Sequence, residues 1–194
     1  MHNQITVEEL NVLIEKAKNG DVRAFEVIVR AYQRYGLAVS FRILCSEDDA
    51  KDIVQESFIR IWKHLKSYDP KVKFTTWMYK IIVNLCYDKL KSEKRSKMLF
   101  ENMSEEISEL KSLSSTDLEK EFSNKETAML IKYFSNELSE KQRIIFVLRD
   151  IKDFSINEVV EITGMSEASI KTNLFFARQN IRKKIIGLEN ENKM

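Results

Sequence analysis

The sequence has few of the residues that break regular secondary structure. Its 194 residues include four glycines and a single proline, Pro70. Collagen-like and turn-dense all-β folds need frequent breaks and left-handed backbone positions, so this scarcity excludes them. With 43% hydrophobic and 32% charged residues, the chain can still bury a core. A predominantly helical protein is therefore predicted.

Residues that build metal, cofactor and redox sites are scarce as well. The histidines His2 and His64 and the cysteines Cys45 and Cys86 show no metal-ligand spacing. The glycines are too dispersed to form a phosphate-binding loop. We expect both cysteines to be buried, reduced thiols, and we expect no metal and no cofactor. An ordinary metalloenzyme or nucleotide-binding enzyme is disfavoured.

Long apolar runs are also missing. No run approaches the 18 or so residues that span a bilayer, and the polar first residues lack the apolar core of a signal peptide. We therefore expect no membrane insertion by the chain itself and a cytoplasmic location.

Charge is distributed unevenly although the formal net charge is only +2. Residues 1–100 carry 18 Lys and Arg against 13 Asp and Glu, residues 101–126 carry 3 against 8, and residues 127–194 carry 11 against 9. The acidic, serine-rich middle stretch is typical of a solvated linker between two denser segments. An alternative is that this stretch occupies a channel built for nucleic acid.

Hydrophobic periodicity predicts the first helices. Thr6 and Glu9 form a capping-box pattern that opens one helix, and Gly20 ends it. Asp21 is positioned to cap a second helix, with a break expected near Gly36 and a short third piece over residues 37–44.

A longer helix is predicted from Ser46 over about five turns, because apolar residues recur every three or four positions. Its opposite face gathers acids in the first turns, where the helix dipole favours them. Such an acidic face, next to a basic stretch over residues 63–97, suggests two partners for one domain: a basic protein surface and a polyanion.

The loop from Ser67 to Lys73 precedes another helix, expected from Thr75 or Thr76 to about Lys94. One side of this helix mixes aromatic, amide and charged residues at spacings of three and four: Trp77, Lys80, Asn84, Asp88, Lys91 and Arg95. Unstacked bases stack on aromatics and lysines track phosphates, so this face suits single-stranded nucleic acid. The alternative is a partly buried tryptophan beside ordinary surface lysines.

The last part of the chain has a helix-turn-helix layout. Residues 122–134 predict a helix, Ser139 with Gln142 caps another, and Ser155 with Glu158 opens a short one. Gly164 makes the turn, and Ser166 caps a final helix to about Ile186. That helix presents a face able to enter a major groove: Lys171, Thr172, Phe175, Arg178, Arg182 and Lys183. A plain helical hairpin is the alternative.

Three segments in this order resemble the extracytoplasmic-function sigma factors of the seventy-kilodalton sigma family. They are DDAKDIVQESFIRIW (residues 48–62), FTTWMYKIIVNLCYDKLKSEKR (residues 74–95) and FSINEVVEITGMSEASIKTNLFFARQNIRKKI (residues 154–185). The resemblance implies an all-α protein of two small helical domains joined by an acidic linker, the second domain a helix-turn-helix. The bounds expected are 1–97, 98–116 for the linker, and 117–188.

The resemblance also implies partners and site residues. Core RNA polymerase would bind the first segment through Asp48, Asp49, Asp52, Gln55, Glu56 and Phe58. The minus-ten promoter element would be melted and read by Tyr68, Lys71, Trp77, Lys80, Asn84, Asp88 and Arg95. The minus-thirty-five element would be read by Lys171, Thr172, Phe175, Arg178 and Arg182. Asn173 and Phe176 stand where the family commonly has basic residues, and Val160 replaces a usual alanine.

The function expected is therefore that of a non-enzymatic initiation factor, with promoter DNA and an anti-sigma factor as further partners. Two alternatives stay open at this point. A stand-alone helix-turn-helix regulator would dimerise on paired half-sites, and the sequence shows no heptad helix for this. An enzyme acting on nucleic acid would need a metal-binding carboxylate cluster; the acids of residues 48–56 lie close together, but they share their helix with no histidine or partner motif. A polar linker also favours two domains that move independently when free.

Overall fold

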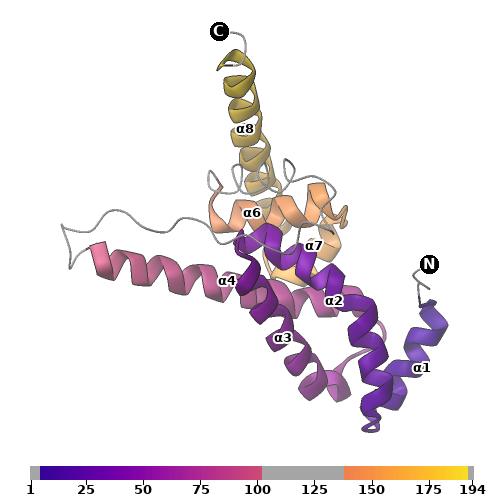
Figure 1. The fold of residues 1–194 in the computed structure, drawn as a ribbon. Helices are drawn as coiled ribbons and strands as arrows, with labels where there is room; N and C mark the ends of the chain where they lie inside the picture. The colour runs from indigo at the N-terminus through magenta and orange to yellow at the C-terminus, as the bar shows by residue number, and fades with distance from the viewer. Residues whose placement is uncertain (1–4, 102–137, 192–194) are drawn as a thin grey trace.

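All the elements described by the structure are helical. A computed structural model describes residues 5–101 and 138–191, without the side chains of 97–101 and 187–191 (Figure 1). Its elements are α1 (Val7–Lys18), α2 (Val22–Leu44), α3 (Glu47–His64), η1 (Leu65–Ser67), α4 (Phe74–Glu101), α6 (Glu140–Phe146), η3 (Val147–Ile151), α7 (Ile156–Thr163) and α8 (Glu167–Glu191). The helix predicted over residues 122–134 and the acidic stretch lie outside the described residues.

The predicted helix starts in the first half are confirmed. Thr6 and Glu9 form a complete capping box at α1. The Asp21 side chain accepts a hydrogen bond from the Ala24 amide at the start of α2, and Ser46 accepts one from the Asp49 amide at α3. Each cap satisfies an amide that has no partner within its helix, so these residues fix where the helices begin.

The prediction of a break near Gly36 is wrong, because α2 runs unbroken through it. A β-carbon built at Gly36 would lie 3.1 Å from Ile82 Cδ1 and 3.5 Å from Val54 Cγ2. Glycine here lets α2 approach the side chains of α3 and α4, and the tertiary packing outweighs its low helix propensity. The residue marks a close contact between helices and not a helix end.

Caps also set the helix-turn-helix. Ser139 with Gln142 and Ser155 with Glu158 form the two predicted capping boxes. Gly164 ends α7 in the left-handed conformation at φ 69°, as the predicted turn requires. Ser166 accepts a hydrogen bond from the Ser169 amide and begins α8. Between α6 and α7 the chain makes a π-helical turn, η3.

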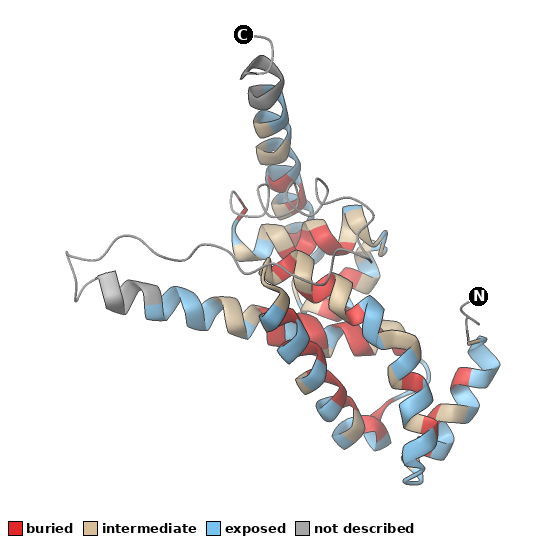
Figure 2. Cartoon of the chain, in the orientation of Figure 1, coloured by how far each residue is buried: buried red, intermediate tan, exposed pale blue. Residues whose placement is uncertain are grey.

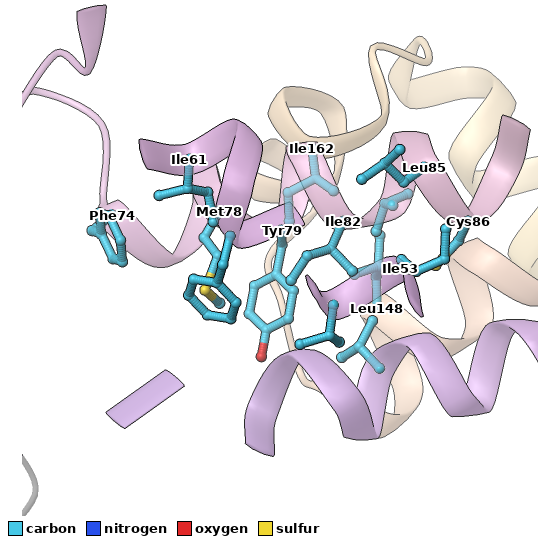
Figure 3. Packing of buried hydrophobic residues seen from close by; sticks show 14 of the residues in the cluster. Ile53, Ile61, Phe74, Met78, Tyr79, Ile82, Leu85, Cys86, Leu148 and Ile162 are labelled. Atoms are coloured by element: carbon cyan, nitrogen blue, oxygen red, sulfur yellow. The ribbon is translucent and has the colours of Figure 1, made fainter. Parts of the chain in front are cut away.

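The two halves of the chain share one hydrophobic cluster. Helix α7 packs on α4, and Leu148 and Ile162 belong to the same buried cluster as Ile82 and Leu85 (Figure 3). The Tyr79 ring meets the Phe154 ring edge to face at 5.2 Å. Figure 2 shows the buried residues concentrated where these helices meet, while the far ends of α4 and α8 project away from the body. The structure thus places in contact two domains for which the polar linker favoured independent motion.

Polar contacts cross the same boundary as well. Lys73 Nζ lies 2.8 Å from Glu158 Oε1, and Lys94 Nζ lies 3.4 Å from Glu140 Oε1. Arg143 donates a hydrogen bond to the Ile43 carbonyl at 3.0 Å. The lysine lowers the pKa of Glu158 to about 2, helped by hydrogen bonds from Ser155. The carboxylate therefore stays charged in this contact at neutral pH.

Candidate functional site: three polar helix faces

The acidic face of α3 is exposed along one line of the helix. Asp48, Asp52 and Gln55 are solvent exposed, while Ala50, Ile53 and Val54 of the same turns are buried. Ile59 continues the line one turn further and is 41% exposed. Two carboxylates, an amide and one apolar residue are therefore available to a partner on this face.

Asp49 and Glu56 flank this line and are already paired. Asp49 lies 2.6 Å from Lys89 Nζ of α4, and its hydrogen bond raises the pKa of Lys89. Glu56 lies 2.7 Å from Arg60 Nε, one turn along its own helix. Asp49 thus links α3 to α4. Asp52 is exposed on the line itself, so it is the better candidate for contact with a basic partner.

Phe58 is buried, at 6% exposure, and meets the Phe25 ring edge to face at 6.4 Å. It lies in a predominantly apolar groove of about 760 Å³ between α2 and α3. The lining residues are Val22, Phe25, Val29, Gln33, Arg34, Leu37, Lys51, Val54, Gln55, Phe58, Ile59 and Trp62. Phe58 shapes the groove from within, and Gln55 and Ile59 of the exposed line are also among the lining residues.

Sequence reasoning missed this groove and the place of Ile59 in it. The available signal was an exposed apolar residue four positions after Gln55 on an otherwise polar line. The α2 side of the groove carries no comparable signal, because Phe25, Val29 and Leu37 fit the core stripe of their own helix.

The mixed face of α4 is also formed as predicted. Lys80, Asn84, Asp88 and Arg95 are exposed along successive turns. Trp77 at the head of the face is half-buried, and its ring lies 5.2 Å from Tyr68 and 5.9 Å from Phe74. The aromatic neighbours therefore hold the indole ring in place, and the part of it that they leave uncovered is exposed to solvent.

Tyr68 lies behind this face instead of on it. Its side chain is buried at 6% exposure, and its hydroxyl donates a hydrogen bond to the Val72 carbonyl at 2.7 Å. Burial raises the pKa of Tyr68. Lys71 is exposed in the same loop, where its amide donates to the Asp69 carboxylate. Tyr68 therefore supports Trp77 and shapes the loop, and of the two loop candidates Lys71 is the exposed one.

The exposed face of α8 carries Lys171, Thr172, Phe175 and Arg182. Lys171 Nζ lies 2.6 Å from Glu167 Oε1. Arg178 donates to both oxygens of Asp150, at 2.8 and 2.6 Å, and this tie joins α8 to η3. Asp150 thus engages Nε and Nη2 of Arg178, and this contact positions the helix. Phe176 is an additional exposed residue of this face, at 46% exposure.

Within residues 5–101 and 138–191 no three His, Cys, Asp or Glu side chains gather as metal ligands would. Cys86 is buried and Cys45 half-buried, both as free thiols, and burial raises the pKa of Cys86 to about 12. No helix in those ranges has the length and apolar character needed to cross a bilayer.

Comparisons with known proteins match both halves of the chain. Residues 28–96 match the family described as Sigma-70 region 2, and residues 129–181 match Sigma-70, region 4. The ECF RNA polymerase sigma factor SigW of Bacillus subtilis is 30% identical over 183 residues, covering 90% of this chain and 96% of SigW.

Solved structures share the fold at lower identity. CnrH, in complex with the cytosolic domain of CnrY, matches with a TM-score of 0.66 and 19% identity over 91% of this chain and 96% of CnrH. RpoE of Bartonella quintana, in complex with the anti-sigma factor NepR, matches with a TM-score of 0.62 and 21% identity over 84% of this chain and 96% of RpoE. The two-part helical architecture is therefore one that known proteins adopt along nearly their whole length.

Proposed function

This chain belongs to the extracytoplasmic-function RNA polymerase sigma factors, and from that premise we propose that it binds bacterial core RNA polymerase and directs it to specific promoters. The observation that carries the proposal is that one chain has three distinct faces. The face on α3 is acidic and adjoins a groove, and the faces on α4 and α8 are each suited to nucleic acid. A stand-alone helix-turn-helix regulator would account for α8 alone. It leaves the region 2 match over residues 28–96 without a purpose.

We assign the work to two parts of the chain. Residues 1–97 bind core polymerase and recognise and melt the minus-ten element. Residues 117–188 recognise the minus-thirty-five element, and residues 98–116 connect the two. The contact of α4 with α7 gives these two parts a defined arrangement in the free protein.

Core polymerase docks at the groove between α2 and α3 in this proposal. Gln55 and Ile59 belong to the lining, which accepts side chains from the polymerase. Asp48 and Asp52 are exposed on the same line of α3 as Gln55, and in this proposal they form the acidic edge that meets a basic surface. Apolar burial supplies affinity, and the acidic edge supplies orientation and a fast encounter. A basic helical segment fits this combination of an elongated apolar groove and an acidic edge.

Promoter DNA meets the other two faces. Trp77 provides a fixed aromatic surface for an unstacked base, and Asn84 can hydrogen-bond a base edge, with Lys80 and Arg95 close to phosphates. Extruding a base costs a few kcal/mol, and a chain of net charge +2 gains little nonspecific affinity for DNA. Melting therefore depends on the assembly with core polymerase.

The remaining assignments follow from this role. The protein acts as a binding and positioning subunit without a catalytic site of its own, in the cytoplasm where transcription occurs. An anti-sigma factor is a further partner, as the RpoE complex with NepR illustrates for that relative.

The proposal is tested by reversing the charge of Asp52. We expect Asp52→Lys to weaken binding to core polymerase about ten-fold at low salt and less at high salt, because it places like charges at a complementary interface. Fluorescence anisotropy of the labelled full chain with purified core polymerase measures this. Asp52 is preferable to Glu56, since reversing Glu56 also breaks its pair with Arg60.

Glu8→Lys is the matched control, because it makes the same charge change at an exposed position of α1. Equal affinity of wild type and Asp52→Lys would remove this face from the interface. Absence of binding by the wild-type chain itself would reject the proposed function.

A further inference from the structure

Two adjacent aromatic side chains on α8, Phe175 and Phe176, are exposed to solvent. Phe175 is 63% exposed and Phe176 46% exposed. Their ring centroids lie 5.5 Å apart with an interplanar angle of 73°, an edge-to-face contact. Large exposed apolar side chains that adjoin each other commonly mark a surface that is covered during function.

The pair occupies the outward side of the helix. Ile170, Leu174 and Ala177 are buried against the domain body. Since α-helical residues turn by about 100° each, Phe175 and Phe176 fall on the opposite side and flank Thr172 and Gln179. This is the side that a recognition helix presents to a major groove.

Neighbouring charges indicate a nucleic acid as the covering partner. Lys171, Arg182 and Lys183 are exposed on the same stretch of α8, and the helix begins at a capped N-terminus with Ser166. Cations and a helix N-terminus favour phosphates on either side of the groove. A protein partner with an apolar surface would instead have to bury these positive charges.

Thr172 and Gln179 can hydrogen-bond base edges, and the two phenylalanines beside them offer a different kind of contact. Glu167 pairs with Lys171, and Asp150 accepts from Nε and Nη2 of Arg178. Phenylalanine side chains offer no donor or acceptor. The one apolar group that the major groove presents at base edges is the C5 methyl of thymine, and phenylalanine is among the residues that contact it.

We propose that Phe176 is a specificity-determining residue that, together with Phe175, reads the C5 methyl group of thymine in the upstream promoter element. This inference rests on the proposed function and deepens it. The two rings at 73° form a stepped apolar surface, so a methyl group seated against them loses contact with water on more than one side. Positions of the element facing Phe176 are therefore thymine.

The test removes only the methyl group. Promoters are first located by mapping RNA 5′ ends made by the full chain with core polymerase on fragmented genomic DNA of the bacterium that encodes it. Duplexes are then made in which each thymine of the upstream element is replaced, one at a time, by deoxyuridine, which keeps base pairing. Competition binding of the holoenzyme measures relative affinity.

We expect deoxyuridine at one or two positions to lower wild-type affinity about four-fold, the ratio for one buried methyl group. The Phe176→Ala holoenzyme should bind the thymine duplex more weakly and show no further loss with deoxyuridine there. Ile186→Ala is the matched control, because Ile186 is 47% exposed on the same helix, about 15 Å further along. It should keep the full wild-type sensitivity to the methyl group.

Three results would overturn the inference while leaving the proposed function intact. Wild-type affinity could be insensitive to deoxyuridine at every position. Phe176→Ala could keep the whole methyl effect, which would assign it to another residue. The variant could also bind promoter DNA like wild type, which would indicate that the pair serves a protein partner. Holoenzyme that makes no promoter-specific RNA would reject the proposed function and this inference with it.

Discussion

Trp77 shows how a partly exposed aromatic residue can be held rigidly by its neighbours. Its ring packs against Tyr68 and Phe74, and Tyr68 is in turn fixed by the hydrogen bond from its hydroxyl to Val72. A fixed aromatic surface loses little conformational entropy when a base stacks on it. The exposed amide of Asn84 lies two turns further along the same face.

At this scale the sharpest prediction concerns Asn84. We expect Asn84→Ala to reduce open-complex formation about ten-fold, because one hydrogen bond to an extruded base is lost. Affinity for core polymerase should not change, since Asn84 lies outside the α2–α3 groove. Permanganate reactivity of thymines in the melted strand measures the open complex.

Asn11→Ala serves as the control, because Asn11 is exposed on α1 and belongs to none of the three faces. Equal permanganate reactivity in Asn84→Ala and wild type would exclude Asn84 from the melting site.

At the scale of the element, α2 is the helix on which the first half is assembled. It contacts α1, α3 and α4, and it supplies one side of the groove proposed for core polymerase. Gly36 sets the distance of this helix from its neighbours. The width of the groove therefore depends on a residue without a side chain.

We expect Gly36→Val to lower the free energy of unfolding by about 1–3 kcal/mol, the usual cost of overpacking a core. Ile82, the nearest neighbour, is fully buried and cannot move aside easily. Urea denaturation followed by circular dichroism measures the change. Arg23→Val, at an exposed position of α2, should cost less than about 0.7 kcal/mol, since only helix propensity is affected.

If Gly36→Val and Arg23→Val had the same free energy of unfolding, α2 would be able to move away from α3 and α4 and admit the valine at no cost. The close approach seen at Gly36 would then have no role in stability.

At the scale of the whole molecule, the two faces proposed to bind DNA belong to one body. Helix α7 contacts both α4 and α8. Elements centred at minus ten and minus thirty-five lie about 25 base pairs apart, or about 85 Å of B-form DNA at 3.4 Å per base pair. Reading both elements together therefore depends on how far apart the two faces lie, which the contacts of α7 with α4 and α8 fix while the halves stay together.

The contact of Lys73 with Glu158 makes the closed arrangement measurable through a titration. Lys73 is the main cause of the pKa of about 2 at Glu158, and the hydrogen bonds from Ser155 add to it. We expect Lys73→Gln to raise the Glu158 pKa toward, but not to, the ordinary value of about 4.3. NMR titration of the glutamate side chains measures the midpoint.

The sign of the pH dependence follows from the lowered pKa. A carboxyl group whose pKa falls on folding stabilises the folded state above its unfolded pKa, and this contribution is lost as the pH falls toward about 2. Its size is limited because the Lys73 side chain is 74% exposed. An unchanged Glu158 pKa in Lys73→Gln would show that the halves are apart in the free protein, since the two residues meet only across their boundary.

Local features of the fold were predictable from the sequence because they depend on nearby residues. Capping boxes at Thr6, Ser139 and Ser155, and the left-handed turn at Gly164, require residues only three or four positions apart. The exposed lines of α3 and α4 followed from helical periodicity in the same way. These features place most of the candidate site residues on their faces.

Features that depend on distant residues were not predictable in this way. Gly36 resembles a helix break until Ile82 is placed against it, and Tyr68 resembles a surface aromatic until Trp77 and Phe74 cover it. The groove between α2 and α3 and the contact of Tyr79 with Phe154 join segments that periodicity treats separately. Pairing of Arg178 with Asp150 likewise needs the fold.

The cluster shared by the two halves sets a thermodynamic condition on every partner of the protein. Burying Tyr79 against Phe154 favours the arrangement in which the two halves are in contact. A partner that needs the halves apart must supply the free energy of separating them, and its net binding free energy is weaker by that amount. A partner that binds the closed arrangement better competes with polymerase even where the two share no contact surface. The combined strength of the contacts between the halves, this apolar one among them, therefore sets how readily the free protein is committed to, or withheld from, transcription.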